Sequence, residues 1–236
     1  MADNCAMSNS SSIDRRHFII ACSTLGSSLL VPQISFAKED ETEEVGPAED
    51  LMREHGGLNR ILLIYEEGIR RITAKTNVDL SVVKKSATIV RTFIEEYHEK
   101  LEEEFIFPRM RKEKKLVELV DTLETQHKAG RKLTATIEQL SVQSTLKSES
   151  ETAKLISAIN QFIRMYRPHE SREDTVLFPT FHKMLSEKEY DMLGEKFEDR
   201  EHKLFGKEGF DGIVEKIMEL EKSYDIYDLT KFTPHI

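Results

Sequence analysis

Two segments of the sequence carry a histidine and a glutamate four residues apart, each followed by a Phe-Pro pair. The first runs from His98 to Glu102 and the second from His169 to Glu173, with Phe-Pro at the same offset in both. Residues four apart lie on one face of a helix, and this face is otherwise apolar in both segments. Two buried carboxylates in one interior repel each other unless a cation lies between them. The repeat therefore predicts a site for a pair of metal ions inside a helical protein.

Two further histidines lie on predicted apolar helix faces. His55 falls between Leu51 and Leu58, and His127 follows Leu123 by one turn. A single histidine on an apolar face is more often a hydrogen-bonded core residue than a ligand. Four such histidines, two of them with a glutamate one turn later, favour metal ligation, because imidazole and carboxylate together suit transition metals.

Cysteine chemistry is confined to the start of the chain. Cys5 and Cys22 are its two cysteines, and both precede Ala37. Removal of a leader at that point would leave no thiol, which excludes disulfides, cysteine–zinc sites and iron–sulfur clusters from the body of the protein. The metal site must then be built from histidine and carboxylate.

Residues 1–37 are predicted to be an export signal. Arg15-Arg16 opens a mildly apolar stretch, and Ser35-Phe36-Ala37 offers a small-x-small cleavage site. The pattern resembles a twin-arginine signal, although Asp14 precedes the arginines and no lysine follows the apolar pair. The resemblance implies a periplasmic protein exported by that route. The alternatives are a tail with a chance Arg-Arg pair, or a lipoprotein site at Cys22, which too little apolar sequence precedes.

Composition and charge indicate a soluble helical protein. Charged residues make up 33% of the 236 residues and aromatic residues 8%, with few glycines and prolines. The net charge of −9 offers no basic face to nucleic acid or to anionic lipid. No run of about eighteen apolar residues follows the leader, so no stable membrane insertion is expected after signal removal.

Hydrophobic periodicity predicts an all-α fold. After an acidic linker over 38–47, four long helices are expected over 48–72, 79–107, 114–140 and 151–178, the second ended by Pro108. Two shorter helices over 186–205 and 211–221 follow, and 223–236 is a tail. Short connections make the long helices an antiparallel up-down-up-down four-helix bundle, with one or two extra C-terminal helices on its outside or end. The bundle domain is expected to span 48–222.

This arrangement resembles the hemerythrin-like HHE cation-binding family over roughly Pro47 to Phe205. The resemblance rests on the two His-x-x-x-Glu…Phe-Pro segments and on Glu124-Thr125-Gln126-His127. It implies two non-haem iron ions joined by an oxygen bridge, with manganese or zinc as the alternative metals. It also implies a set of nitrogen ligands and bridging carboxylates, namely His55, His98, His127 and His169 with Glu102 and Glu173.

The sequence departs from the oxygen carriers of that family in two places. Arg131 stands where their third helix has a second histidine, and the fourth helix has Glu173, followed by Asp174, in place of an aspartate at a spacing of five. Two octahedral irons offer about twelve positions, and the implied ligands would leave two of these open instead of one. His202 is a candidate fifth nitrogen ligand, although its place at the edge of an apolar stripe equally allows it to lie outside the site.

Residues around the predicted ligands receive simpler interpretations. Glu99 and Glu170 are expected on solvated faces, with hydrogen bonding to the ligand histidines as the alternative, and Glu103 is expected to be surface charge. Phe107 and Phe178 are expected to plug the end of the bundle.

Three functions agree with these residues. The first is a non-enzymatic binder of a diatomic ligand, either oxygen or nitric oxide. The second is a di-iron enzyme that breaks down hydrogen peroxide or reduces nitric oxide, and the third is a bundle that holds iron or uses its metal structurally. The resemblance favours the first two, with the binder first. The oligomeric state stays open.

Overall fold

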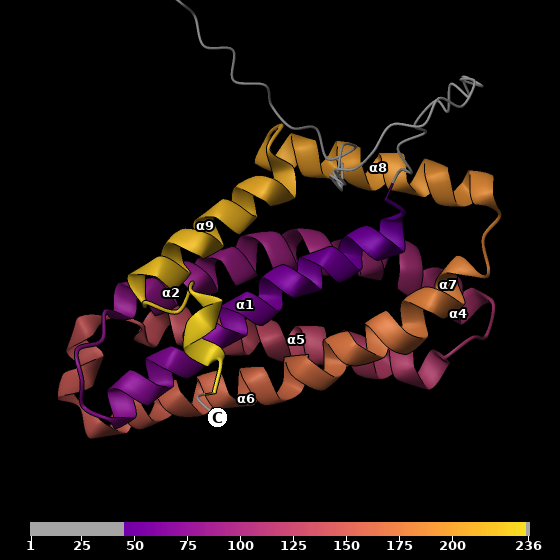
Figure 1. Ribbon diagram of the computed structural model, residues 1–236. Coiled ribbons are helices and arrows are strands. Elements are labelled where there is room, and N and C mark those ends of the chain that lie inside the picture. The colour runs from indigo at the N-terminus through magenta and orange to yellow at the C-terminus, as the bar shows by residue number, and fades with distance from the viewer. Residues whose placement is uncertain (1–44, 235–236) are drawn as a thin grey trace, which may run out of the picture. The chain divides into compact units, whose positions relative to one another are not determined.

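The computed structural model describes residues 45–234 (Figure 1). The predicted signal over 1–37 and most of the linker over 38–47 lie outside these residues. Within 45–234 every regular element is a helix and no strand occurs, which confirms the all-α prediction. No helix in this range has both the length and the apolar character needed to cross a membrane.

Four antiparallel helical rods form the bundle in the described part of the chain (Figure 1). The first rod is α1 (Pro47–Thr73) and the third is α5 (Val117–Leu140). The second rod is a continuous series of helical segments: α2 (Leu80–Ile89), η1 (Val90–His98), α3 (Glu99–Leu101), η2 (Glu102–Ile106) and α4 (Phe107–Lys112). The 3₁₀ turn η3 (Gln143–Lys147) leads to the fourth rod, which consists of α6 (Glu149–Arg172), η4 (Glu173–Leu177) and α7 (Phe178–His182).

The rods begin and end close to the predicted positions, for local reasons. The Asp79 carboxylate accepts a hydrogen bond from the Ser81 N–H at 2.9 Å and so caps the second rod. The third rod starts at Val117 and not at the predicted residue 114, because Lys114 and Leu116 have left-handed backbones with φ of 55° and 49°.

The second and fourth rods continue through their Phe-Pro pairs, so the prediction that Pro108 ends the helix was wrong. In both rods a π-helical segment begins at the motif glutamate, and the Phe107 and Phe178 N–H groups bond to the carbonyls of Glu102 and Glu173, five residues back. The wider turn changes the pairing just ahead of the proline, whose ring would clash with the carbonyl four residues back in a regular α-helix. Such π-bulges are frequent at functional sites.

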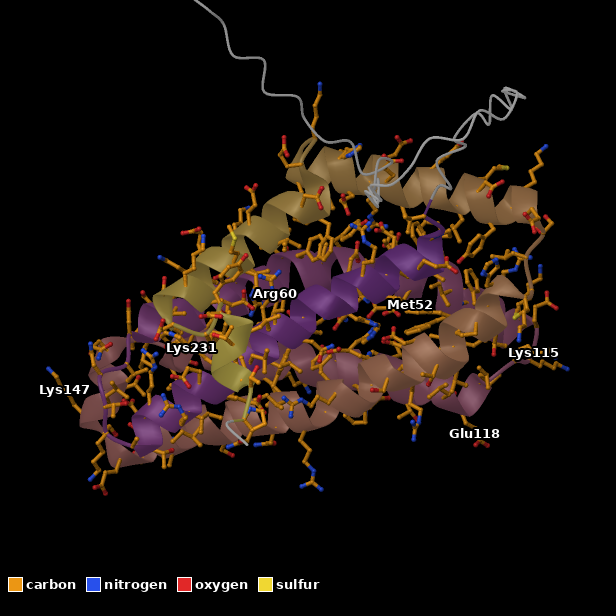
Figure 2. The ribbon with its side chains drawn as sticks, viewed as in Figure 1. Met52, Arg60, Lys115, Glu118, Lys147 and Lys231 are labelled. Atoms are coloured by element: carbon orange, nitrogen blue, oxygen red, sulfur yellow. The ribbon has the colours of Figure 1, made fainter. Side chains whose placement is uncertain are left out.

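Two further helices cover one side of the bundle, as predicted. α8 (Glu187–Phe205) begins at the expected Ser186 capping box, and α9 (Gly209–Ser223) lies against α1 and α2 (Figure 1). A Cβ at Gly57 would lie 3.1 Å from the Phe210 ring, so this glycine permits the close approach of α9. Arg60, labelled in Figure 2, pairs with Glu221 of α9 at 2.5 Å. In the predicted tail, the structure adds one 3₁₀ turn, η5 (Leu229–Phe232).

Candidate metal centre

Each rod contributes one histidine to a single buried level of the bundle. His55, His98, His127 and His169 are all at most 3% exposed. The ring centroids of His55 and His98 are 4.7 Å apart, and those of His127 and His169 are 5.1 Å apart. The imidazoles therefore form two pairs. We call the space faced by His55 and His98 the first position, and that faced by His127 and His169 the second position.

Glu102 and Glu173 lie between the two pairs and are fully buried. Glu102 Oε2 is 3.9 Å from His98 Nε2 and 3.4 Å from His127 Nε2. Glu173 Oε2 is 3.4 Å from His55 Nε2, and Glu173 Oε1 is 3.1 Å from His169 Nε2. Each carboxylate thus faces one imidazole of each pair, which is the arrangement needed to bridge two metal ions.

Several of the atoms that face this space lack hydrogen-bond partners. Both carboxylate oxygens of Glu102 and of Glu173, together with His127 Nε2, are buried without one. Unpartnered buried carboxylates are strongly destabilising, and a cation between them would satisfy every one of these atoms. His127, His169 and Glu173 also offer ligand atoms within 4.8 Å of one another. The donor set of imidazole nitrogen and carboxylate oxygen therefore fits a pair of iron, manganese or zinc ions.

Each imidazole is held from the side that faces away from the cluster, where its Nδ1–H donates a hydrogen bond. The four acceptors are Asp174 for His55 at 2.7 Å, Glu54 for His98 at 2.8 Å, Glu103 for His127 at 3.2 Å and Gln126 for His169 at 2.9 Å. In the neutral imidazole, a proton held at Nδ1 leaves the lone pair of Nε2 directed into the cluster. This is the tautomer that ligation through Nε2 requires.

Protons occupy part of the cluster when no cation is bound. Burial, reinforced by the charge of Glu173, raises the pKa of Glu102 to about 8. Burial opposes ionisation of Glu173 as well, but His169 and His55 outweigh it and hold the pKa of Glu173 well below its usual range. Burial and the neighbouring His55 lower the pKa of His98 well below its usual value. Metal ions and protons therefore compete for the same atoms.

Phe107 and Phe178, predicted to plug the end of the bundle, lie against the ligand histidines. Both are fully buried, and each stacks on the imidazole of another rod. The Phe178 ring lies 5.7 Å from that of His55 with 20° between the planes, and the Phe107 ring lies 5.4 Å from that of His127 with 25° between the planes. The π-helical segments thus serve two purposes, because they place both the bridging glutamate and the ring that covers a ligand.

Three glutamates expected to be solvated line the surroundings of the site, so that prediction was wrong. Glu99 and Glu170 are 1% and 2% exposed, and the Glu103 side chain is 17% exposed. Glu99 accepts a hydrogen bond from the Tyr166 hydroxyl at 2.6 Å and pairs with Arg131 at 2.7 Å. Each rod is covered by more than one neighbour, so its buried face is wider than the apolar stripe read from the sequence.

The outer partners of the histidines were largely missed from the sequence. Glu54 was not predicted to support a histidine. Its position next to His55 in the sequence is the only feature that could have suggested this role. Gln126 was noted only as part of the motif around His127, and Asp174 only as an aspartate at the family's spacing. Each of them contacts a histidine of another rod, which a pattern within one helix cannot reveal.

The structure does not bring His202 into the cluster. The neighbouring Glu201 is fully buried on α8, and its carboxylate accepts a hydrogen bond from the Phe210 N–H at 3.1 Å. His202 is half-buried, whereas the other six predicted ligands are at most 3% exposed. The geometry brings the other six predicted ligands together and leaves His202 outside, at the edge of the apolar stripe of α8.

The bundle and its buried histidine–carboxylate cluster define the class as a helical protein with a candidate metal-binding centre. The family model for the Hemerythrin HHE cation binding domain matches residues 46–181 and also 118–228. The chain belongs to this family.

Relatives of similar length carry names that state no function. The "Uncharacterized protein Mb2018" of Mycobacterium bovis and the "Uncharacterized protein MT2051" of Mycobacterium tuberculosis are each 41% identical over 233 residues. Each alignment covers 94% of this chain and 91% of the relative. No solved structure matches the chain.

Proposed function

We propose that the chain binds two non-haem iron ions and takes up a diatomic ligand, oxygen or nitric oxide, at that centre. The observation that carries the proposal is the pairing of four inward-facing Nε2 atoms with two shared, unpartnered carboxylates. An iron pair, when bound, supplies the electrons with which such ligands are held.

The residues of the chain supply binding, orientation and exclusion of water. The Nδ1 hydrogen bonds fix the four rings, so that the nitrogen ligands are oriented before a metal arrives. The buried rings of Phe107 and Phe178 cover His127 and His55 and keep bulk water from that side of the imidazoles. A dry site strengthens the electrostatic attraction between the carboxylates and a cation.

A second candidate is an enzyme that breaks down hydrogen peroxide or reduces nitric oxide. The specific observation in its favour is the position of His202 outside the cluster, because the remaining ligands would leave one more coordination position open than in a five-histidine carrier. The third candidate, a bundle that only holds iron or uses it structurally, requires that no small ligand binds.

One experiment separates these candidates. The iron-loaded protein is reduced without air, exposed to oxygen or nitric oxide, and followed by its optical spectrum, and hydrogen peroxide consumption is measured in parallel. A stable, reversible spectral change without peroxide loss supports the binder, and rapid peroxide loss supports the enzyme. No change with either gas and no peroxide loss would leave only the iron-holding bundle. His202→Ala is the matched control, and we expect it to keep the parent's iron content and spectrum.

Export by the twin-arginine route remains a proposal about residues 1–37. It suits a protein that must acquire its iron in the cytoplasm before it meets competing metals. We expect replacement of Arg15 and Arg16 by lysine to retain the precursor in the cytoplasm, as measured by cell fractionation. Undiminished export of that variant would point to the general secretory route.

A further inference from the structure

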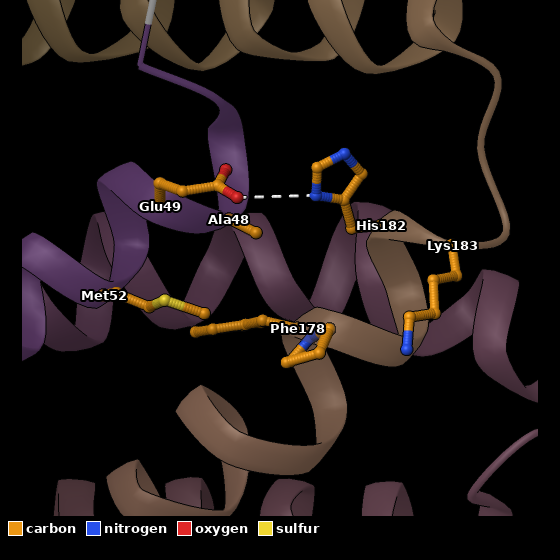
Figure 3. Close-up of a pocket in the computed structure, with 7 residues that line it drawn as sticks. Ala48, Glu49, Met52, Phe178, His182 and Lys183 are labelled. Atoms are coloured by element: carbon orange, nitrogen blue, oxygen red, sulfur yellow. Dashed lines mark ion pairs between the residues drawn. The ribbon is translucent and has the colours of Figure 1, made fainter.

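A cavity of about 330 Å³ opens between the start of α1 and α7 (Figure 3). Its lining consists of Ala48, Glu49, Met52, Phe178, Pro179, His182 and Lys183. The side chains that form its inner wall are apolar, whereas the charged ones are exposed at its rim. The volume lies in the range of cavities that bind small molecules, and apolar cavities take up uncharged guests such as xenon.

The floor of this cavity is the ring that covers a predicted ligand. Phe178 is fully buried, and its ring stacks on His55 with the centroids 5.7 Å apart. On the inner side of that imidazole, His55 Nε2 faces Glu173 at 3.4 Å. The Phe178 ring therefore lies between the cavity and His55, a predicted ligand of the first position.

The rim is held together by an aromatic and ionic cluster. His182 pairs with Glu49 at 3.4 Å, as Figure 3 shows, and stacks on Tyr190 with ring centroids 3.8 Å apart. The Tyr190 hydroxyl donates to the same Glu49 carboxylate. These contacts join α1, α7 and α8 beside the opening, so the cavity is part of the folded structure and not a gap at a loose end.

The second position is more closely covered than the first. Phe107 stacks on His127 as Phe178 stacks on His55, but it does not line this cavity. The Glu103 side chain that supports His127 is 17% exposed and paired with Arg131, whereas the Asp174 side chain that supports His55 is 35% exposed. The two Phe rings thus form a matched pair, of which Phe178 lines this cavity and Phe107 does not.

We propose that this cavity binds small uncharged molecules and is the vestibule through which the diatomic ligand reaches the first position, with Phe178 as the gate. The route rests on the proposed uptake of oxygen or nitric oxide, but binding within the cavity does not. The apolar inner wall selects uncharged guests, because transfer of an ion into it would cost desolvation energy.

Xenon tests the cavity without any reaction at the metal. Crystals of the metal-loaded protein under xenon pressure should show xenon density against Met52 and Phe178. Met52→Trp, which fills the cavity, should abolish that density, and Met192→Trp on the exposed face of α8 should retain it. Absence of xenon from the parent, or its retention in Met52→Trp, would overturn the cavity as a binding site.

Stopped-flow association of nitric oxide with the reduced, iron-loaded protein tests the route. We expect Met52→Trp to slow association by about tenfold and Phe178→Leu to accelerate it, with Phe107→Leu giving the smaller acceleration of the two. Xenon binding together with parental association rates in Met52→Trp and Phe178→Leu would overturn the gate and leave the proposed function intact. A parent that binds xenon but neither gas would overturn the proposed function and the route while leaving the cavity.

Discussion

The two candidate metal positions differ in what supports their imidazoles. At the first position, His55 and His98 donate to the carboxylates of Asp174 and Glu54. At the second, His169 donates to the neutral amide of Gln126. The remaining imidazole, His127, donates to Glu103 Oε1, an oxygen that also accepts from Arg131 at 2.6 Å. The ligands repeat in the sequence, but their supports do not.

This difference teaches that a symmetric motif can build an asymmetric centre. A carboxylate that accepts the Nδ1 proton makes the imidazole a stronger donor to a metal than an amide does. The first position should therefore bind its metal more tightly and favour the higher oxidation state. It is also the position beside the cavity, so the more easily oxidised metal would lie nearer to the incoming ligand.

The largest effect is expected where the two positions share a ligand. Glu173→Ala removes one carboxylate from both positions and should remove most of the metal from both. The positive charge of the buried cations would then be only partly compensated by the remaining carboxylate. Elemental analysis of the iron-loaded variant measures this loss. Asp174→Ala, the neighbouring change, removes only an outer partner of His55 and should retain metal at the second position. Equal retention in both variants would refute the bridging role.

Substitution of the residues that accept the Nδ1 hydrogen bonds should change the difference in metal affinity between the two positions. Glu54→Gln should weaken the metal at the first position by roughly 10–100-fold, the usual cost of losing an outer partner. Gln126→Glu should strengthen the second position, and the double variant should bring the two affinities together. Chelator competition followed in two phases measures both affinities. Identical two-phase curves for parent and double variant would show that the supports do not set the asymmetry.

Removal of both metals should lower the thermal midpoint. With free metal at about 100 times the dissociation constant of each position, binding contributes ~2.7 kcal/mol per metal ion, and each such contribution is equivalent to about 5–10 °C for a chain of this size. Thermal melts before and after chelation measure the change, and Glu173→Ala should show a smaller difference between the two. A parent with the same midpoint in both states would mean that the carboxylates need no cation.

The smallest effect is a pH dependence that appears mainly in the metal-free protein. Burial raises the pKa of Glu102 and of Glu170 to about 8 and that of Glu95 to about 7. A raised pKa contributes stability at low pH that is lost as the pH rises through the folded value. The metal-free protein should therefore lose stability as the pH rises from about 4.5, the ordinary value for these carboxyl groups, to about 8. His98 and Glu173, whose pKa values are lowered, act in the opposite direction, because their contributions are lost as the pH falls below the ordinary values of about 6.5 and 4.5.

Denaturant melts across this range, with and without metal, measure the two slopes. Metal should flatten the decline, because the bound form needs an ionised Glu102 at every pH. Glu170→Gln should also reduce the decline in the metal-free protein, since it removes one of the buried groups that ionise. If stability falls with pH equally in the parent, in that variant and in the metal-loaded protein, ionisation of these buried carboxyl groups is not its cause.

The positions of the six clustered residues could be predicted because they follow helical periodicity. His98 with Glu102, and His169 with Glu173, lie one turn apart on one face, and the pattern predicts both the interior position and the shared chemistry. The bundle followed from the same periodicity. His202 was the exception, because an edge position in a stripe does not determine whether a side chain faces inward.

The supports could not be predicted because they depend on contacts between rods. Glu54 reaches His98, and Asp174 reaches His55, only after the bundle has formed. The passage of the second rod through Pro108 depends on a π-helical turn that hydrophobic periodicity does not reveal. The asymmetry of the centre therefore belongs to the tertiary structure and not to the motif.

Anomalous diffraction at the iron edge from iron-loaded crystals tests the central claim most directly. Two peaks are predicted, one facing His55 and His98 and the other facing His127 and His169, with Glu102 and Glu173 in contact with both and His202 with neither. A single peak would contradict the paired centre. A peak at the other acidic grouping, formed by Asp50, Glu54 and Glu201, with the histidines unliganded, would contradict the site itself.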